Sequence, residues 1–449
     1  MDLLGSLSRR IFIPLHEWKH GVSAAPLRRT LMKSQFLSPD QIRDNQWCDL
    51  QKIVAFAYHH NRFYRQRFDE AGFELGDLKE FSDFEKLPML TKDDLRNNLD
   101  DLISDGLKKE NLHWRRTGGS TGVPVQVYWD DYANMFKPAM VYRHDSWAGF
   151  LPAARKAALW GNISRKLSLK GKVYHALFIR TIYLDTLEMD DDHILAFIET
   201  IKRYKPRLLF GHGHSIFFFA SFLSDRDIDD IRFDGIISSA ETLPPAERKV
   251  VEDVFGKIVF DRYGCEEVAL IASECEAHDG LHIGAEGIYV EVSGGDDRTP
   301  GRVILTDLVN KGTPLIRYEV GDLATSRSGV CACGRGLPRL GRVVGRTSDI
   351  LYTPEGKMIS GISILDTFTI HIPGFKQVQV VQEKLDELTF NIVKADDYSD
   401  ESLRLLAESI PRYFGPSMKH RVIFRDEIPM TGRGKFQFSI CKLSKSDLP

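Results

Sequence analysis

The first segment whose residue types could bind a ligand is Arg115–Val125, RRTGGSTGVPV. Three glycines, two threonines and one serine fill six consecutive positions in it. Backbone N–H groups bind phosphate best where no side chain blocks the approach, and glycine leaves that approach open. The Ser and Thr hydroxyls add donors around an anion. The stretch is not a Walker loop, because no Gly-Lys-Ser/Thr follows, and it is not a GxGxxG motif. A connecting loop or hairpin remains the alternative.

Four other segments carry residue types that suit a nucleotide and its metal ion. An aromatic ring, a glycine and two carboxylates follow a strand-like run in Asp261–Glu267, DRYGCEE. Asp322 ends the run LTDLVNKGTPLIRYEVGD, and Gly345–Asp349, GRTSD, offers an arginine before an aspartate. Near the C-terminus, Pro429–Lys435, PMTGRGK, presents a lysine on a Gly-rich loop. Each segment alone also fits a turn or a solvated surface, but their order and spacing together are specific.

In that order the segments resemble the motif series of the adenylate-forming, acyl-CoA synthetase-like enzymes. The branch most similar is that of the phenylacetate–CoA ligases and CapK-like proteins, and the resemblance extends to Ser34–Phe68 near the N-terminus. It implies an enzyme that joins a small carboxylic acid, aromatic or otherwise hydrophobic, to AMP with release of pyrophosphate and then passes the acyl group to CoA. Transfer to an amine, a hydroxyl or a carrier-protein thiol is the alternative activity. A non-enzymatic nucleotide-binding protein is a third reading.

The resemblance implies a set of nucleotide-binding residues. The phosphate loop is Thr117, Gly118, Gly119, Ser120, Thr121 and Gly122, which would hold the β- and γ-phosphates of ATP. Tyr263 matches the ring that stacks on adenine, with Ala240 and Glu241 on the other side of the base. Asp322 matches the carboxylate that accepts the ribose hydroxyls, and Arg346 the arginine that reaches the ribose and phosphate side.

The catalytic residues implied by the resemblance are Glu267, as a ligand of Mg²⁺, and Lys435, which would bridge the attacking carboxylate and the α-phosphate. A carboxylate oxygen suits a hard dication, and a compact ammonium on a flexible stem suits the bridging role. The family usually has Thr or Ser, as a phosphate contact, where this chain has Glu266, so the chain departs from the family's pattern at this position. The structural alternatives are a solvated acidic turn, a helix cap at Asp322 and a surface charge at Lys435.

The expected acid pocket lies around Gly211, His212, His214 and Trp160. Phenylalanines crowd this part of the chain, and most of them are more typical of helix core than of a ligand slot. Flanking glycines favour a tight backbone turn that turns the histidines toward the ligand.

A metal clip is the expectation for Cys275, His278, Cys331 and Cys333, with His282 as the competing ligand. Four protein ligands would make a closed structural zinc site. The spacing between the last two cysteines is tighter than the usual two-residue gap, and reduced, buried thiols are an equal alternative.

The order of the helices and strands expected around these residues predicts an α/β fold with two domains. Residues 1–110 are a mostly helical segment, in which Asp49–Phe73 has apolar residues at helical spacing. Short β-rich runs then alternate with helical stretches to about residue 345, which is typical of an α/β domain. From Asp349 the pattern resets to strand, strand, helix and strand. We expect a large ATP- and acid-binding domain over 1–347 and a small, mobile α+β domain over 348–449, with a hinge at Ser348.

Composition narrows the function classes. Lys and Arg number 60 and Asp and Glu 63, so the net charge of −3 gives no basic footprint for nucleic acid. The most apolar run, Leu208–Leu223, is interrupted by Gly and His and predicts no transmembrane segment. The N-terminal residues lack a signal peptide pattern. They are mildly amphipathic and basic, so membrane-surface contact is open, although packing on the main domain is favoured. We expect a cytoplasmic protein, with a homodimer as an open alternative.

Overall fold

The fold is described from a computed structural model of the 449-residue chain. The structure describes residues 2–19, 24–116, 125–160, 168–186, 188–346, 350–356, 358–360, 372–429, 437–443 and 447. Within these ranges no helix combines the length and the apolar character needed to cross a membrane.

Helices dominate the first hundred residues, as the sequence predicts. They are α1 (Leu3–Leu7), η1 (Ser8–Phe12), α2 (Ile13–Lys19), α3 (Ala24–Ser34), α4 (Pro39–His60), α5 (Arg62–Glu70), η2 (Leu75–Asp77), α6 (Phe81–Phe84) and α7 (Lys92–Asn97). The stretch expected as one helical run is divided at Asn61, whose φ of −138° ends α4 and whose side chain accepts a hydrogen bond from the Tyr64 amide to start α5. The Asn side chain caps the second helix, and this local bond outweighs continuation of the first.

One mixed sheet of eleven strands forms the body of the described chain, in the order β10-β11-β12-β13-β9-β8-β7-β6-β5-β3-β4. Its strands are β3 (Lys156–Trp160), β4 (Thr181–Asp185), β5 (Leu208–His212), β6 (Gly235–Ser239), β7 (Val259–Cys265), β8 (Ala269–Glu274), β9 (Leu281–Ile283), β10 (Ile288–Ser293), β11 (Gly301–Asp307), β12 (Tyr318–Arg327) and β13 (Arg339–Arg346). The strands from β4 to β7 pair in parallel, and the remainder pair antiparallel.

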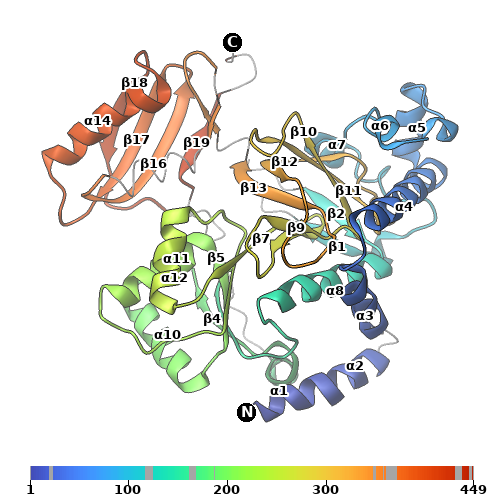
Figure 1. The fold of residues 1–449 in the computed structure, drawn as a ribbon, viewed down its shortest axis with the longest axis horizontal. Coiled ribbons are helices and arrows are strands. Elements are labelled where there is room, and N and C mark those ends of the chain that lie inside the picture. The colour runs from blue at the N-terminus through green and yellow to red at the C-terminus, as the bar shows by residue number, and fades with distance from the viewer. Residues whose placement is uncertain are drawn as a thin grey trace.

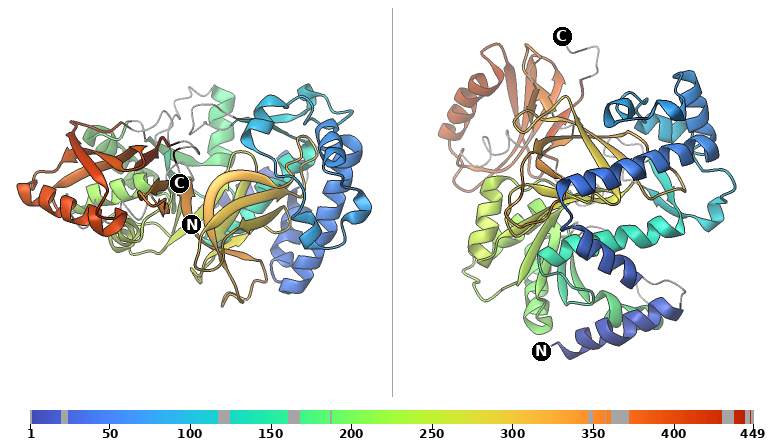
Figure 2. Two further views of the ribbon diagram at one scale, coloured as in Figure 1. Left: turned by 90° about the horizontal axis from the view of Figure 1, so that it is seen from above. Right: turned by 45° about the vertical axis from the view of Figure 1, so that its right-hand side comes forward.

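Helices cover the sheet because its strands present apolar side chains. On the parallel half, α10 (Asp191–Tyr204), α11 (Gly213–Ser224) and α12 (Pro245–Phe255) enclose one core with β3, β5 and β6. The apolar face of α10 recurs at helical spacing, with Ile194, Phe197, Ile198 and Ile201 buried. On the antiparallel half, α4 runs beside the sheet (Figure 2), and its Gln46 amide donates to the carbonyls of Ala285 and Ile288.

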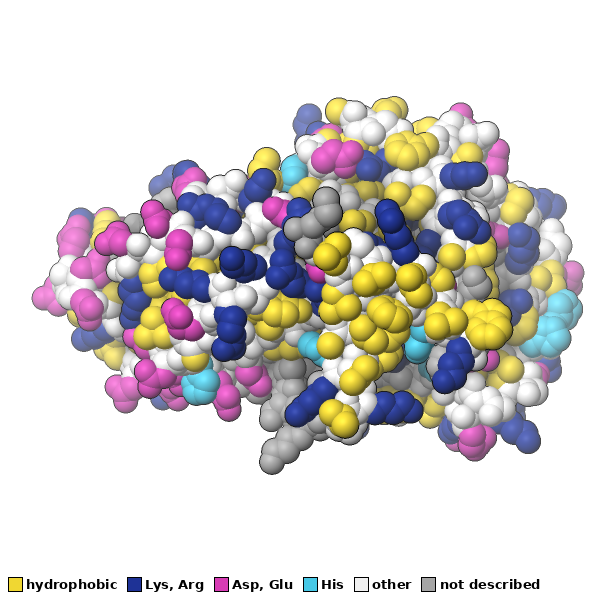
Figure 3. All heavy atoms as spheres, turned by 90° about the horizontal axis from the view of Figure 1, so that it is seen from below, with side chains coloured by type: hydrophobic (Ala, Val, Ile, Leu, Met, Phe, Trp, Pro, Cys, Tyr) yellow, Lys and Arg dark blue, Asp and Glu magenta, His cyan; other side chains and the backbone are white. Residues whose placement is uncertain are grey.

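The remaining elements of the body connect these layers. A separate hairpin of β1 (His113–Arg116) and β2 (Gln126–Trp129) flanks the residues 117–124. It is followed by α8 (Asp131–Trp147), and η3 (Lys109–Asn111) precedes it. Helices α9 (Leu169–Tyr174) and η4 (His175–Ile179) join β3 to β4. Helices α1 and α2 lie at the base of the molecule in Figure 1, and Figure 3 views this base from below.

A small α+β unit follows the body and lies beside α11 (Figure 1). It contains β14 (Ile350–Tyr352), β15 (Met358–Ser360), β16 (Phe375–Lys384), β17 (Glu387–Lys394), α14 (Asp400–Phe414), β18 (Lys419–Phe424) and β19 (Ser439–Cys441). Four strands pair in the order β18-β17-β16-β19, and α14 packs on them around a core of its own.

The expected fold class is therefore confirmed: a large α/β body with mixed sheet and helices, and a small C-terminal α+β unit. The expected boundary at residues 347 and 348 lies outside the described residues, and the division into domains 1–347 and 348–449 stays a prediction.

Candidate functional site

The hairpin of β7 and β8 carries three of the predicted site residues: Tyr263, Glu266 and Glu267. A bulge between Tyr263 and Gly264 interrupts the β7–β8 register. A side chain at Gly264 would collide with the carbonyl oxygen of Ala269, so only glycine lets the two strands close here. The turn that follows places Glu266 at the surface and buries Glu267.

Glu267 is held in place by two hydrogen bonds, one to its carboxylate and one to its backbone carbonyl. Its residue is 4% exposed, and its Oε1 accepts a hydrogen bond of 2.8 Å from the hydroxyl of Tyr318. The indole N–H of Trp129 donates to its backbone carbonyl at 2.8 Å. Burial, together with the nearby Glu267 carboxylate, raises the pKa of the Cys265 thiol well above its usual value, so this neighbour is a neutral thiol.

A buried ion pair between Lys137 and Asp307 supports the same turn. The ammonium of Lys137 lies 2.6 Å from Asp307 Oδ2, and both side chains are almost fully excluded from solvent. Lys137 also donates to the Val268 carbonyl at 3.5 Å. Asp307 in turn accepts from the amides of Val309 and Asn310. The turn that carries Glu267 is thus tied to α8 and to the end of β11.

Tyr263 and Asp322, 59 residues apart, meet across the sheet. The Tyr263 hydroxyl donates to Asp322 Oδ2 at 2.6 Å. Asp322 is 9% exposed and lies on β12, where its backbone pairs with that of Arg346 on β13. Two residues expected to hold adenine and ribose are therefore in contact, and the backbone of Arg346 lies opposite one of them.

The ends of β5 and β6 lie together beside this pair. Ala240 follows β6 with a φ of +68°, a left-handed conformation that turns the chain at the carboxyl end of the strand. The Glu241 carboxylate accepts from the amide of His214, at 3.2 Å. At Gly213 a Cβ would lie 3.1 Å from the Ser238 hydroxyl oxygen, so the glycine permits the close approach of the two strand ends.

His214 joins the body to the small unit. Its ring nitrogen Nδ1 lies 3.2 Å from Glu247 Oε1, and its ring centroid lies 5.2 Å from that of Phe438, which precedes β19. Burial opposes the charged form of His214, but the carboxylates of Glu247 and Glu241 outweigh it and raise its pKa. Phe438 is anchored in turn, because its carbonyl accepts from the amide of Val380 on β16.

A cavity of about 240 Å³ opens on the face of the sheet away from α11. It is lined by Lys156, Ala158, Trp160, Thr181, Tyr183 and Phe210. The indole of Trp160 stacks on Phe210 with ring centroids 5.1 Å apart, and lies 4.2 Å from the ring of His212. Of the four residues expected in the acid pocket, Trp160 lines this cavity, whereas Gly211, His212 and His214 stand at the end of β5 beside it.

A second, more polar cavity of about 460 Å³ lies at the end of β1. Its lining is Leu112, His113, Trp114, Arg115, Arg116 and Glu266. The strand β1 leads directly into residues 117–124, so this cavity adjoins the start of the expected phosphate loop. Thr117–Gly122, Ser348 and Lys435 themselves lie outside the described residues, as does the side chain of Arg346.

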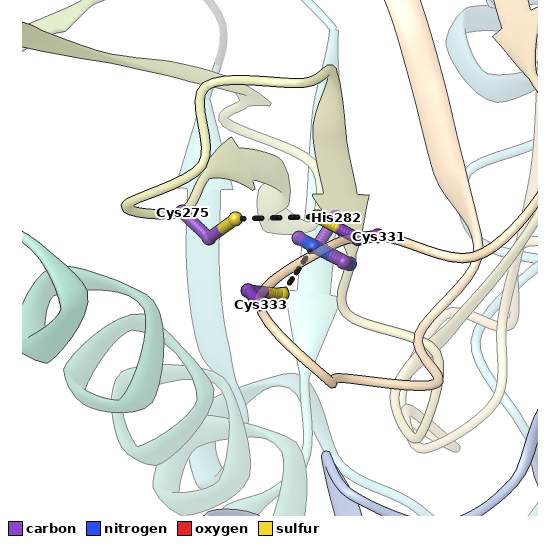
Figure 4. Close-up of side chains that lie close together, drawn as sticks. All are labelled: Cys275, His282, Cys331 and Cys333. Carbon is purple, nitrogen blue, oxygen red and sulfur yellow. Dashed lines mark hydrogen bonds between the residues drawn. The ribbon is translucent and has the colours of Figure 1, made fainter.

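Three cysteines and a histidine form a compact cluster elsewhere on the sheet (Figure 4). The ligand atoms of Cys275, His282, Cys331 and Cys333 all lie within 4.8 Å of one another. Cys275 Sγ is 3.7 Å from Cys331 Sγ, and Cys333 Sγ is 3.3 Å from His282 Nε2. No disulfide forms, since all six cysteines of the chain are free thiols.

The expectation of His278 as the fourth member is wrong, and His282 takes its place. His278 sits in the turn after Cys275, where its Nδ1 lies 3.0 Å from Glu274 and its ring packs on Phe260. His282 lies on β9, which pairs with β13 through Arg339, and this pairing brings it to the loop that carries Cys331 and Cys333.

The donor set and its spacing fit a tetrahedral zinc ion. With usual zinc–ligand bond lengths, a tetrahedral site separates two sulfurs by about 3.8 Å and a sulfur from a nitrogen by about 3.6 Å. His282 Nδ1 lies 3.1 Å from the Leu337 carbonyl, an arrangement that directs the Nε2 lone pair to the cluster. Burial lowers the pKa of His282 to about 4, which keeps the imidazole neutral. The cluster can therefore hold zinc.

Sequence reasoning missed three supporting residues: Tyr318, Trp129 and Lys137. Tyr318 could have been found from the sequence, because it precedes Asp322 by four residues on the same strand. Side chains at an even spacing on a strand lie on the same face of the sheet. Trp129 and Lys137 reach the site from β2 and α8, and nothing in their local sequence indicates a contact more than 130 residues away.

Solved structures share this fold. A 2-hydroxyisobutyryl-CoA ligase in the postadenylation state, in complex with 2-HIB-AMP, superposes with a TM-score of 0.68 at 20% identity, over 88% of this chain and 89% of that one. The same ligase in the thioesterification state, with 2-HIB-AMP and CoA, gives a TM-score of 0.56 at 20% identity, over 88% of both chains. The fold is that of the adenylate-forming ligases.

Sequence comparisons define the branch. A family model described as the CapK C-terminal domain matches residues 351–442. Protein CapK of Staphylococcus aureus is 24% identical over 364 residues, which is 79% of each chain. A phenylacetate–coenzyme A ligase of Escherichia coli (strain K12) is 27% identical over 341 residues, which is 70% of this chain and 73% of that enzyme. Over most of its length the chain is therefore similar to CapK and the phenylacetate–CoA ligases, a branch of the adenylate-forming ligases.

Proposed function

We propose that this protein is an ATP-dependent carboxylic acid ligase that forms an acyl-AMP, releases pyrophosphate and then transfers the acyl group to CoA. The observation that carries the proposal is the contact between Tyr263 and Asp322, 2.6 Å apart, beside a hairpin whose turn presents Glu267. A Mg²⁺-bound adenine nucleotide requires an aromatic ring for the base, an acceptor for the ribose diol and a carboxylate for the metal ion. Tyr263, Asp322 and Glu267 are of these types.

At the nucleoside end, adenine stacks on the ring of Tyr263 and lies against Ala240 and Glu241. Asp322 accepts the ribose hydroxyls, because a carboxylate offers two acceptor oxygens to two adjacent donors. The hydroxyl of Tyr263 donates to one of those oxygens and fixes the carboxylate before the nucleotide binds. Arg346, whose backbone pairs with that of Asp322, is the residue that the resemblance assigns to the phosphate side.

At the triphosphate end, the amides and hydroxyls of Thr117–Gly122 hold the β- and γ-phosphates. Arg115 and Arg116 lie in the polar cavity that adjoins this loop and add positive charge. Mg²⁺, when bound, supplies charge neutralisation on the phosphates, and Glu267 is the carboxylate placed to hold it. Glu266, which stands where the family usually has a hydroxyl, lines the same cavity, and this supports a position for it near the proposed phosphate site.

The small unit supplies Lys435, which neutralises the attacking carboxylate and the α-phosphate in the adenylation step. Its loop precedes Phe438, and the Phe438 ring packs against His214 of the body. The superposition is also better on the postadenylation form of the related ligase, with TM-scores of 0.68 against 0.56. Both observations support an arrangement suited to the first half-reaction, with rotation near Ser348 for the second.

The acid binds in the cavity lined by Trp160, Tyr183 and Phe210. Three aromatic rings favour an aromatic or otherwise hydrophobic acid. Lys156, whose pKa burial lowers, stands at the far end of the strand from Trp160 and offers one polar contact. The cluster of Cys275, His282, Cys331 and Cys333 binds a structural zinc ion, since four protein donors leave no open position for catalysis.

The test measures pyrophosphate release over a panel of acids, with and without CoA, and identifies the product by mass. We expect acid-dependent release of pyrophosphate and an acyl-CoA product. Turnover that ignores CoA would assign the alternative acceptor, an amine, a hydroxyl or a carrier-protein thiol. No pyrophosphate with any acid, together with no ATP binding by calorimetry in the presence of Mg²⁺, would contradict the proposal.

A further inference from the structure

The N-terminal helix is amphipathic in the reverse of the usual sense. From Leu3 to Lys19 the elements α1, η1 and α2 follow one another without a break. Gly5 and Ser8 are the buried residues of this helix. A surface helix of a soluble domain normally turns its large apolar side chains toward the core, so this arrangement needs a reason.

The outward face of the helix carries five large apolar side chains. They recur at intervals of three or four residues and are 45% to 79% exposed: Leu3, Leu7, Ile11, Leu15 and Trp18. Singly exposed apolar residues are ordinary, but a continuous stripe marks a contact surface.

A second exposed apolar pair extends the stripe. Leu169 and Val173, one helical turn apart on α9, are 81% and 54% exposed. The segment that contains them lies beside the N-terminal helix, because the ring of His16 packs on Tyr174 and Phe178, at 5.7 and 5.1 Å. Figure 3 shows hydrophobic side chains gathered in the middle of this face, with Lys and Arg side chains around them. We name this surface the basal patch.

In the part of the chain that the structure describes, the charged side chains of the basal patch that form no ion pair are all positive. Its two carboxylates are both neutralised: Asp2 pairs with Arg180 at 2.7 Å, and Glu17 with Arg28 at 2.9 Å. The exposed cations on its helices are Arg10, Lys19, Lys170 and Lys172. Within the described residues no carboxylate forms an ion pair with any of these four.

We propose that the basal patch docks the protein on an anionic membrane surface, with the helix lying in the plane of the interface. An exposed apolar stripe with cations at its flanks and a Trp at one end is what an interfacial helix presents to lipid. A second copy of the chain fits this face poorly. In a two-fold contact the same patch meets itself, and its unpaired cations would face one another.

The test uses the full chain with vesicles of phosphatidylcholine, alone or with phosphatidylglycerol. We expect sedimentation with the phosphatidylglycerol vesicles only, weakened by salt, and a blue shift of Trp emission that is lost in Trp18→Phe. Leu7→Ser removes apolar contact and should lower partitioning about tenfold. Lys170→Gln and Lys172→Gln should each lower it about fivefold.

The matched control is Leu107→Ser, which exchanges another exposed leucine, 39% exposed, beside the C-terminal end of α4. It should leave partitioning unchanged, and thermal unfolding checks that each variant is folded. Absence of binding to phosphatidylglycerol vesicles, equal binding by Leu7→Ser, or equal binding to phosphatidylcholine would overturn the proposal. Light scattering that shows a dimer broken by Leu7→Ser would assign the patch to a second copy and overturn it as well.

Discussion

Removing one hydroxyl, in Tyr318→Phe, tests whether Glu267 is a metal ligand. The hydroxyl donates to Glu267 Oε1 at 2.8 Å, and neither residue is more than 4% exposed. Phe keeps the ring and its packing, so the substitution removes the bond and little else. The carboxylate then keeps its place in the turn but loses the group that orients it.

The bond joins a neutral donor to a carboxylate, and such bonds contribute about 1.5–3 kcal/mol. At about 1.4 kcal/mol per factor of ten, that range equals a change of about 10- to 150-fold in an equilibrium constant. Loss of a group that orients a metal ligand lowers metal affinity by about 10- to 100-fold, a range that agrees with the value derived from the hydrogen bond. We therefore expect the Mg²⁺ concentration for half-maximal pyrophosphate release to rise at least tenfold.

The control is Tyr64→Phe, the same change at another fully buried tyrosine. The Tyr64 hydroxyl bonds the Pro314 carbonyl and the Ile316 amide, close to the same strand but without contact to Glu267. Both variants should lower the free energy of unfolding, measured in urea, whereas only Tyr318→Phe should change the Mg²⁺ requirement. An unchanged requirement in a folded Tyr318→Phe enzyme would refute the assignment of Glu267.

Four further outcomes are expected. Lys435→Ala should abolish acyl-AMP formation but spare thioester formation from synthetic acyl-AMP, and equal loss of both half-reactions would contradict its role. Lys137→Met leaves the buried carboxylate of Asp307 unpaired and should cost about 3–5 kcal/mol in the urea-measured free energy of unfolding; a loss below about 1 kcal/mol would count against the ion pair. Cys333→Ser should reduce the zinc content, measured by atomic emission, and lower the thermal midpoint, and an unaltered zinc content would exclude the cluster as the site. Burial and a neighbouring carboxylate raise the pKa of Asp261 to about 7, so stability should fall as pH rises from about 4 to 7; Asp261→Asn should remove about 2–3 kcal/mol of that fall between about pH 5 and 7, and parallel pH curves would be inconsistent with it.

The amino-acid sequence by itself determined the fold class and the elements with strong periodicity. The strands β16 and β17 and the helix α14 occur where alternation and helical spacing predict them, because each has one face to bury and the local pattern says which. The ordered motifs likewise indicated the superfamily to which the comparisons found the chain similar. The locations of Thr117–Gly122 and Lys435 stay predictions, since they lie outside the described residues.

Contacts between distant strands were decided only by the tertiary structure. Local spacing favoured His278 in the metal cluster, but the pairing of β9 with β13 places His282 there. The partners of Glu267, Tyr318 and Trp129, come from strands 51 and 138 residues away. The pattern of the N-terminal helix alone allowed either packing on the main domain or contact with a membrane surface. Periodicity shows that one face of a helix is apolar, but it does not show whether that face points toward the core or toward solvent. Register and packing depend on the whole chain, and a local pattern carries information only about its own neighbours.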